Sequence, residues 1–285
     1  MRFLPGILSL LLVSVVQAQT PLLDINTSAN GSSPRELIQV DGRLFFTAEV
    51  PGTGREVYTW TAGEGATLLG DLIPGSDHSA AGILGSVGSR VLFRAGSDLW
   101  ASDGLETLQL ESFERISNGF DIGGRYLLFA RSGGKAVLYA TDGTPEGSGP
   151  IHVSDALMGS SDFFSGPLVE NGLFYFGSWD DTAQQFHLWS TDGTSGGTTG
   201  IGPLGLLRGQ MGILNGRLLY VVRDPDQGDE VHSIGLDGTD PQVVWRAAPA
   251  VGGVYTFKIA GTRAYFEAEA EGAGYELHVS DGSVA

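Results

Sequence analysis

Short apolar runs separated by turn residues dominate the pattern of hydrophobic and polar positions along the chain. Most runs either alternate with polar residues or are continuously apolar, and clusters of glycine, aspartate and asparagine separate them. Few stretches have apolar residues at positions i, i+3, i+4 and i+7, the spacing of an amphipathic helix. Alternating and short continuous runs bounded by turn residues indicate β-strands. The pattern therefore predicts an all-β protein.

One segment of this pattern recurs along the whole chain. It consists of an apolar residue, an aromatic residue, two further residues and then Asp-Gly, as in Leu99 to Gly104. Clear copies lie at 99–104, 138–143, 188–193 and 277–282, and looser copies at 57–63 and 231–238. The six copies are spaced by about 45 residues, which is the length of one propeller blade.

Each copy belongs to a larger unit of four short strands. A tight turn and an aromatic-rich run precede the copy, as in Gly42-Arg43-Leu44-Phe45-Phe46. A further short strand lies before that turn, and another follows the Asp-Gly pair. Turns such as Asp41-Gly42 and Asn215-Gly216 suit tight hairpins, which need positive φ at their central residues. Four antiparallel strands in each of six units predict a six-bladed β-propeller.

Closure of this propeller is predicted to involve the beginning of the mature chain. A fourth strand follows copies one to five, whereas copy six is followed only by Ser283-Val284-Ala285. Residues 21–26 contain Leu22-Leu23-Asp24-Ile25-Asn26, which resembles the segment 69–73 of the first unit. We therefore expect this N-terminal strand to complete the last blade and close the ring, which removes exposed strand edges. A solenoid is the alternative, but it requires capping repeats that the sequence does not show.

The first eighteen residues have the pattern of a secretion signal. Arg2 precedes an apolar run over residues 7–16, and Val16-Gln17-Ala18 has the small residues of a cleavage site. The expected organisation is a signal peptide over residues 1–18 and one propeller domain over residues 19–285. The mature protein is expected to be extracellular or periplasmic, without membrane insertion, because the apolar run is too short to span a bilayer.

Composition excludes several classes of function. The formal net charge is −17 and the chain has only two lysines, Lys135 and Lys258, so binding to nucleic acid or to anionic membranes is not expected. The chain has no cysteine, which excludes disulfides, thiolate catalysis and cysteine-ligated zinc.

The repeated segment resembles the ELWxxDGT repeat family. Its copy at 187–194 reads His-Leu-Trp-Ser-Thr-Asp-Gly-Thr, and Asp24-Ile25, 31–34, 42–46 and 56–58 follow the fuller pattern of that family in order. The resemblance covers residues 20–283, although the first and fifth copies are degenerate. It implies a secreted bacterial repeat protein with no established enzymatic activity.

The aromatic position of the repeat has two interpretations. These residues either form a ring of ligand-stacking side chains or pack between neighbouring blades, where large rings fill a wedge-shaped gap. We favour packing, because a strictly periodic position serves the repeat more often than it serves a site. The residues at this position are Tyr58, Trp100, Tyr139, Trp189, His232 and His278.

Acidic residues of the repeat are interpreted in the same way. The aspartates of the Asp-Gly pairs are expected to accept hydrogen bonds from backbone amides of their own turns. They are Asp103, Asp142, Asp192, Asp237 and Asp281. The acidic residues near the start of the third strands are expected to face solvent or to pair with arginines such as Arg55 and Arg94. They are Glu56, Asp98, Glu230 and Glu276.

One loop offers candidate metal ligands. Asp224, Asp226 and Asp229 alternate with other residues before and after Gly228, which resembles the start of a calcium loop. The glutamate that ends an EF-hand loop is absent, and an exposed acidic loop is the alternative interpretation. Calcium is the only cofactor that the sequence suggests.

No catalytic motif is recognisable. The chain has no Gly-x-Ser-x-Gly elbow, no His-Glu-x-x-His and no phosphate-binding loop. The sequence therefore favours a non-enzymatic, monomeric module that binds an extracellular protein or a glycan. A polysaccharide hydrolase or lyase and a calcium-stabilised surface protein are the alternatives.

The loops indicate where a ligand would bind. The turns between strands one and two and between strands three and four are short and repetitive, and they define the Asp-Gly face. The other connections vary, as at 154–164, 178–186 and 223–229, and they define the variable-loop face. Because binding residues concentrate on loops held by a rigid scaffold, a site is predicted on the variable-loop face.

Overall fold

The computed structural model of the chain describes most of the predicted propeller domain. The described residues are 25–26, 31–75, 81–154, 163–224, 228–247, 253–270 and 274–283. The predicted signal peptide and residues 21–24 of the predicted closing strand lie outside them. The described residues form strands and turns without a helix, and therefore none that is long and apolar enough to cross a membrane.

The strands form six antiparallel sheets within the described residues. The first two sheets consist of β1 (Arg35–Val40), β2 (Arg43–Val50), β3 (Gly54–Thr61) and β4 (Gly65–Leu68), then β5 (Gly82–Val87), β6 (Arg90–Ala95), β7 (Asp98–Ser102) and β8 (Thr107–Ser112). The next two consist of β9 (Arg115–Asp121), β10 (Tyr126–Ser132), β11 (Lys135–Thr141) and β12 (Gly149–Val153), then β13 (Phe163–Glu170), β14 (Leu173–Asp180), β15 (Gln185–Thr191) and β16 (Thr199–Gly205). The last two consist of β17 (Leu207–Leu214), β18 (Arg217–Asp224), β19 (Gly228–Gly235) and β20 (Gln242–Arg246), then β21 (Val254–Ala260), β22 (Arg263–Ala270) and β23 (Gly274–Ser280).

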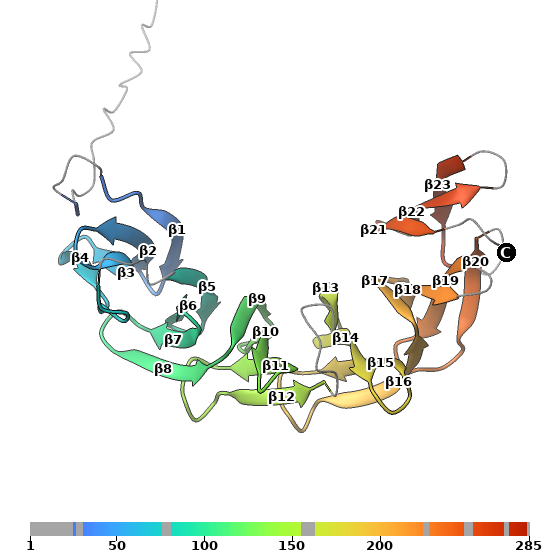
Figure 1. Ribbon diagram of the computed structural model, residues 1–285, viewed down its shortest axis with the longest axis horizontal. Helices are drawn as coiled ribbons and strands as arrows, with labels where there is room; N and C mark the ends of the chain where they lie inside the picture. The colour runs from blue at the N-terminus through green and yellow to red at the C-terminus, as the bar shows by residue number, and fades with distance from the viewer. Residues whose placement is uncertain are drawn as a thin grey trace, which may run out of the picture.

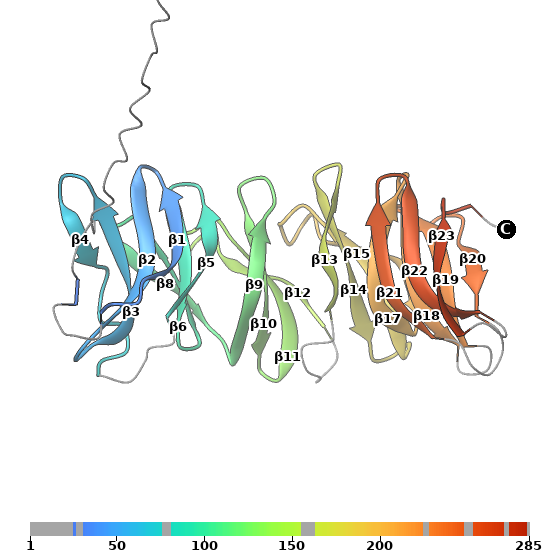
Figure 2. The same cartoon turned by 90° about the horizontal axis from the view of Figure 1, so that it is seen from above.

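The sheets repeat one topology. Strands pair in sequence order in every sheet, and five sheets have four strands whereas the described part of the last sheet has three. Figure 1 shows the sheets side by side in an arc, with β1 to β4 at one end and β21 to β23 at the other. Turned by 90°, the molecule shows its hairpins gathered along two opposite rims (Figure 2), which are the Asp-Gly face and the variable-loop face. The all-β architecture of propeller-type blades is therefore confirmed.

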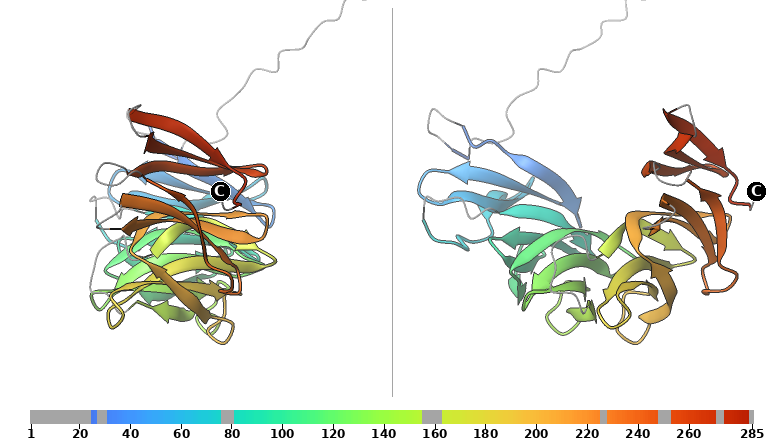
Figure 3. Two further views of the ribbon diagram at one scale, coloured as in Figure 1. Left: turned by 90° about the vertical axis from the view of Figure 1, so that its right-hand side faces the viewer. Right: turned by 45° about the vertical axis from the view of Figure 1, so that its right-hand side comes forward.

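The predicted ring closure is not present in this arc. The first and last sheets lie at separate ends in the oblique view of Figure 3. The described part of the predicted closing strand lies at the first sheet instead of the last. Asn26 Nδ2 donates to the carbonyl oxygens of Gly31, at 2.6 Å, and of Glu49, at 3.3 Å, while Ile25 packs in the cluster around Phe46 and Tyr58.

Packing between successive sheets explains the continuous apolar runs of the sequence. Successive side chains of a strand point to opposite faces, so a strand between two sheets needs apolar residues at every position. In β6, Phe93 points toward the first sheet and packs near Phe45, whereas Leu92 points toward the third sheet and packs near Tyr126. Both faces of such a strand are consequently buried.

The tight turns adopt the backbone conformations that their sequences indicate. At Asp41 and Gly42 φ is 45° and 78°, and at Asn215 and Gly216 it is 52° and 73°. Positive φ at both central residues gives a hairpin turn whose twist matches that of the flanking strands. These turns set the register between β1 and β2 and between β17 and β18.

Replacing a residue between two sheets is expected to destabilise the fold. Leu138 is fully buried against Phe174 and Phe176 of the next sheet, so Leu138→Ala should lower the free energy of unfolding by about 2–5 kcal/mol. Urea unfolding followed by tryptophan fluorescence measures this. Leu105→Ala, at a position 82% exposed, is the control and should change the free energy of unfolding by less than about 0.5 kcal/mol. Equal effects of the two substitutions would contradict this account of the packing.

Candidate functional site

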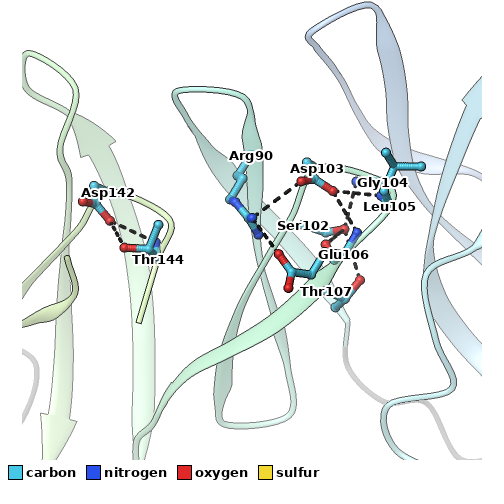
Figure 4. Close-up of polar contacts among 9 residues, drawn as sticks. All are labelled: Arg90, Ser102, Asp103, Gly104, Leu105, Glu106, Thr107, Asp142 and Thr144. Atoms are coloured by element: carbon cyan, nitrogen blue, oxygen red, sulfur yellow. Dashed lines mark hydrogen bonds and ion pairs between the residues drawn. The ribbon is translucent and has the colours of Figure 1, made fainter. Parts of the chain in front are cut away.

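The aspartates of the Asp-Gly pairs lie in their own turns. Oδ1 of Asp142 accepts hydrogen bonds from the amide of Thr144, at 2.9 Å, and from its hydroxyl, at 2.7 Å. Asp192 and Thr194 repeat this arrangement at 2.8 and 2.7 Å. Figure 4 shows the variant at Asp103, where the acceptor takes two backbone amides. The corresponding turns at Asp237 and Asp281 use Thr239 and Ser283.

These hydrogen bonds stabilise the charged form of the carboxylates. The hydroxyl and then the amide of Thr194 lower the pKa of Asp192 below its ordinary value. Burial acts in the opposite direction at Asp142, but the bonds from Thr144 outweigh it and the pKa is again lowered. The turn aspartates are therefore engaged within their own chain segments, on five different sheets.

Arginines connect these turns to the preceding sheets, a feature that our sequence analysis did not predict. A Cβ atom on Gly104 would lie 2.7 Å from Cδ of Arg43, so a larger residue there would push this arginine stem aside. Arg90 lies in the same way against Gly143. Its guanidinium also forms ion pairs with Glu106, at 2.9 Å, and with Asp103, at 3.5 Å (Figure 4). The available signal was the arginine that opens the second strand of most repeats.

The acidic residues at the strand starts have different surroundings from one sheet to the next. Arg55 forms an ion pair with Glu49, at 3.5 Å, and Arg94 forms none with the described residues. Glu230 does pair with an arginine, since its Oε1 lies 3.0 Å from Arg246. Glu56 is fully buried rather than facing solvent. Asp98 is partly buried and Glu276 is exposed, so the four acids do not form a common ring.

Most of the aromatic positions of the repeat lie at contacts between sheets. The ring of Tyr139 meets Phe113 of the preceding sheet edge-on, with centroids 5.1 Å apart. Trp189 packs on His152 of the preceding sheet at 4.3 Å, and His278 packs on Trp245 at 5.2 Å. Trp100 packs in the cluster of Phe93. Tyr58 contacts Phe46, and His232 contacts Tyr220, in each case within one sheet. The six residues lie on six different sheets, and the structure does not bring them together.

The predicted calcium loop has a different set of contacts. Asp229 is 3% exposed, and its Oδ2 accepts hydrogen bonds from Nε of Arg208 and from the amide of Val254, both at 3.0 Å. Asp226 lies outside the described residues. Among the described residues there is no group of three or more His, Asp or Glu side chains that could hold a metal ion. Asp229 therefore joins the fifth and sixth sheets, a role that its position in the loop did not indicate.

A pocket of about 250 Å³ opens between the third and fourth sheets. It lies where β12 and β14 end and where β15 begins, which places it at the variable-loop face. These strand ends flank two of the connections, 154–164 and 178–186, in which the sequence predicts a site. The lining residues are His152, Val153, Ser178, Trp179, Asp180, His187 and Trp189.

The polar groups of this pocket are held by the surrounding strands. Nε2 of His152 lies 2.8 Å from the hydroxyl of Ser178, a contact between two sheets. Oδ1 of Asp180 accepts hydrogen bonds from the amides of Thr182 and Ala183, at 2.8 and 2.9 Å. The bond from Ala183 and then that from Thr182 lower the pKa of Asp180, so its carboxylate is charged at neutral pH. Its Oδ2 faces His187, 3.8 Å from Nε2.

Aromatic rings form the apolar part of the pocket. Trp179 packs edge-on against Phe186, with centroids 5.0 Å apart, and its indole N–H donates to Asp181 at 3.0 Å. Both tryptophans of the lining are partly exposed. A pocket with aromatic walls, imidazoles and a fixed carboxylate can bind a group that combines apolar faces with hydrogen-bonding atoms. Sequence analysis missed His152 and Ser178, because they lie in different repeats and form no motif.

Comparisons with known proteins give no family for this chain. No protein-family model matches it, and no curated protein matches it. Three solved structures that resemble it are the tricorn protease (14% identity, TM-score 0.42), a puromycin hydrolase (12%, 0.43) and TolB from Acinetobacter baumannii (12%, 0.36). The matches cover 85%, 89% and 84% of this chain but 24%, 52% and 63% of those chains. The fold therefore has to be argued from the sheets of this chain, and its function from its own side chains.

Acid is expected to destabilise the protein through the turn aspartates. The pKa values of Asp142 and Asp192 are lowered in the folded chain from the ordinary value of about 3.8. As the pH falls toward that value, the unfolded chain therefore binds more protons than the folded chain does. The free energy of unfolding should therefore fall as pH decreases from about 5 to about 3. Asp192→Asn keeps an acceptor for Thr194 but cannot titrate, so the free energy of unfolding of this variant should fall less over this pH range. Glu146→Gln, at an exposed position of the same face, serves as the control and should behave as the parent chain does.

Calcium is expected to leave the thermal stability unchanged. Binding at Asp224, Asp226 and Asp229 would place the ion beside the Arg208 guanidinium, because Oδ2 of Asp229 already accepts hydrogen bonds from Arg208 and from the amide of Val254. Melting curves in calcium and in EDTA should therefore coincide. A melting temperature that rises with calcium and saturates would show that the loop does bind the ion.

Proposed function

We propose that this chain is a secreted, non-enzymatic interaction module built on a closed six-bladed propeller. Its ligand is a glycan or an extracellular protein, bound at the variable-loop face. The observation that carries the proposal is the pocket around Trp179, Asp180 and His187, which lies among the variable connections. Binding sites are typically concave and largely apolar, with a few polar groups that orient the ligand.

The division of labour within the repeat supports this proposal. The repeated aspartates bond their own turns, and the repeated aromatic residues pack between sheets. The residues around the pocket, by contrast, include positions that are not repeated. The secretion signal and the resemblance to an extracellular repeat family agree with a role outside the cell. The net charge of −17 favours neutral or cationic ligands over anionic ones.

A polysaccharide-active enzyme is the alternative that one contact favours. Ser178 and His152 lie 2.8 Å apart in the pocket, as a nucleophile and its base would. However, Ser178 is only 2% exposed, and the described lining residues include no arginine to bind a developing negative charge. A binding function needs neither an exposed nucleophile nor such an arginine, and the proposal therefore favours binding.

Binding assays with a single substitution in the pocket test this function. The mature protein should bind at least one probe in a panel of immobilised xylan, cellulose, chitin, peptidoglycan and extracellular protein preparations. Trp179→Ala and His187→Ala should each weaken that binding at least tenfold, because both side chains line the pocket. Leu105→Ala, on the opposite Asp-Gly face, should bind as the parent chain does.

Two outcomes would contradict the proposal. Equal binding by the pocket variants and the parent chain would place the ligand elsewhere. Release of soluble sugars from a probe, abolished by Ser178→Ala, would establish the enzymatic alternative. Circular dichroism of each variant checks that a loss of binding does not come from unfolding.

A further inference from the structure

The fourth sheet departs from the repeat at the pocket. Ser178 of β14 lies opposite His187 of β15. In the other five sheets the residue in the place of Ser178 is alanine or valine, and the residue in the place of His187 is acidic in four of them. These opposed pairs are Ala48 with Glu56, Ala95 with Asp98, Ala130 with Val137, Val222 with Glu230 and Ala268 with Glu276. Only the fourth sheet therefore combines a hydroxyl with an imidazole at this position.

Asp180 supplies a negative charge beside this pair. Its Oδ1 accepts hydrogen bonds from the amides of Thr182 and Ala183, which fix the orientation of the carboxylate, and its Oδ2 faces His187. Among the described residues, Asp180 forms no ion pair with a lysine or an arginine, and neither residue type occurs in the described lining of the pocket. The carboxylate is thus held in one orientation without a permanent positive charge beside it.

The nitrogen that faces Asp180 has no hydrogen-bond partner among the described residues. Nε2 of His187 is buried, and its distance of 3.8 Å from Oδ2 of Asp180 is too long for a hydrogen bond. Buried polar atoms are nearly always hydrogen-bonded, so an unpaired one indicates a partner that is either water or a group of a ligand. With the ring proton on Nδ1, both atoms are acceptors, and one donor group about 2.8 Å from each could bond both.

An ammonium group suits these two acceptors better than a neutral hydroxyl does. It has three donor hydrogens where a hydroxyl has one, and its hydrogen bond to a carboxylate is charge-assisted and therefore stronger. The aromatic walls act in the same direction, because the face of an indole ring attracts a cation. Trp179 and Trp189 provide two such rings, both partly exposed. The net charge of −17 also attracts a cationic ligand from a distance.

We propose that the pocket binds an amino sugar through its protonated amine, which rests on the proposed function and names the chemical class of its ligand. The amine donates to Asp180 and His187, while the C–H face of the sugar ring packs on indole. The volume of about 250 Å³ lies below that of pockets for drug-sized ligands, which suits one sugar unit. A lysine side chain carries the same ammonium on a narrow stem that covers less of the two indole rings, so the observations favour the sugar.

Three tetrasaccharides that differ only in the substituent at C2 test this inference. They share a β-1,4-linked glucose backbone and carry an amine in the glucosamine tetramer, an acetamide in the N-acetylglucosamine tetramer and a hydroxyl in cellotetraose. The mature protein, measured by isothermal titration calorimetry at neutral pH, should bind the glucosamine tetramer about tenfold more tightly than either of the others, because only the amine forms a charge-assisted hydrogen bond with Asp180.

Two variants with the same change of charge separate the pocket from the net charge. Asp180→Asn keeps an acceptor for the amides of Thr182 and Ala183, and should weaken binding of the glucosamine tetramer about tenfold, to the affinity of cellotetraose. Asp192→Asn is the matched control, because it removes one charge from an Asp turn on the opposite Asp-Gly face. It should keep the preference for the amine.

Each other outcome overturns the inference. Equal affinity for the three tetrasaccharides, a preference for the acetamide or the hydroxyl, or no binding of any of them would show that the pocket does not select an amine. Equal losses in Asp180→Asn and Asp192→Asn would assign the preference to the net charge. A lysine peptide that binds more tightly than the glucosamine tetramer, and loses this binding when its lysine is acetylated, would assign the amine to a protein.

The inference and the proposed function fail separately. Binding of a probe through Trp179 without a preference for the amine would retain the interaction module and exclude the amino sugar. Binding of every probe by Trp179→Ala as tightly as by the parent chain would remove the pocket itself as the site, and with it the proposed function.

Discussion

Face-to-face packing of successive sheets is the interaction on which the rest of this structure depends. A single four-stranded sheet leaves two apolar faces in water, and each inner sheet of the arc buries both of them against its neighbours. Leu99 and Phe93 illustrate the arrangement, because they belong to one sheet and pack into different clusters. A sheet at the end of such a row necessarily keeps one face without a neighbour. The exposed side chains of β23 follow from the same rule that buries Leu99.

The two faces of the molecule use their residues differently. On the Asp-Gly face, side chains such as Thr191 and Asp192 accept hydrogen bonds from amides of their own turn. Arginines also reach from one sheet to the turn of the next, as Arg43 does at Gly104. Substitution there changes both a turn and a contact between sheets. On the variable-loop face, the described strand ends differ in sequence from sheet to sheet, and the pocket around Asp180 lies among them.

Local patterns were readable from the sequence, whereas contacts between distant residues were not. The hydrogen bonds of Asp142 involve a residue only two positions away, so the turn chemistry of aspartate and threonine predicts them. The pair His152 and Ser178 joins different repeats, and no periodicity relates the two residues. Asp229 has the neighbours of a calcium ligand in sequence but bonds Arg208, which lies on another strand. The strands and turns were therefore predictable, while most of the candidate site was not.

The position of Ile25 connects the repeat pattern with the ends of the arc. A sequence repeat does not by itself show which strand belongs to which sheet, because a strand can be assigned to the repeat before it or to the repeat after it. The contact of Leu72 resolves this for the first repeat, since that residue follows β4 of one sheet and packs on the next. Ile25 stands in the same relation to the first sheet, because it packs against Phe46 and Tyr58. A residue that follows the fourth strand of one unit thus packs on the next sheet, so the sequence repeat and the structural sheet are offset from each other along the chain.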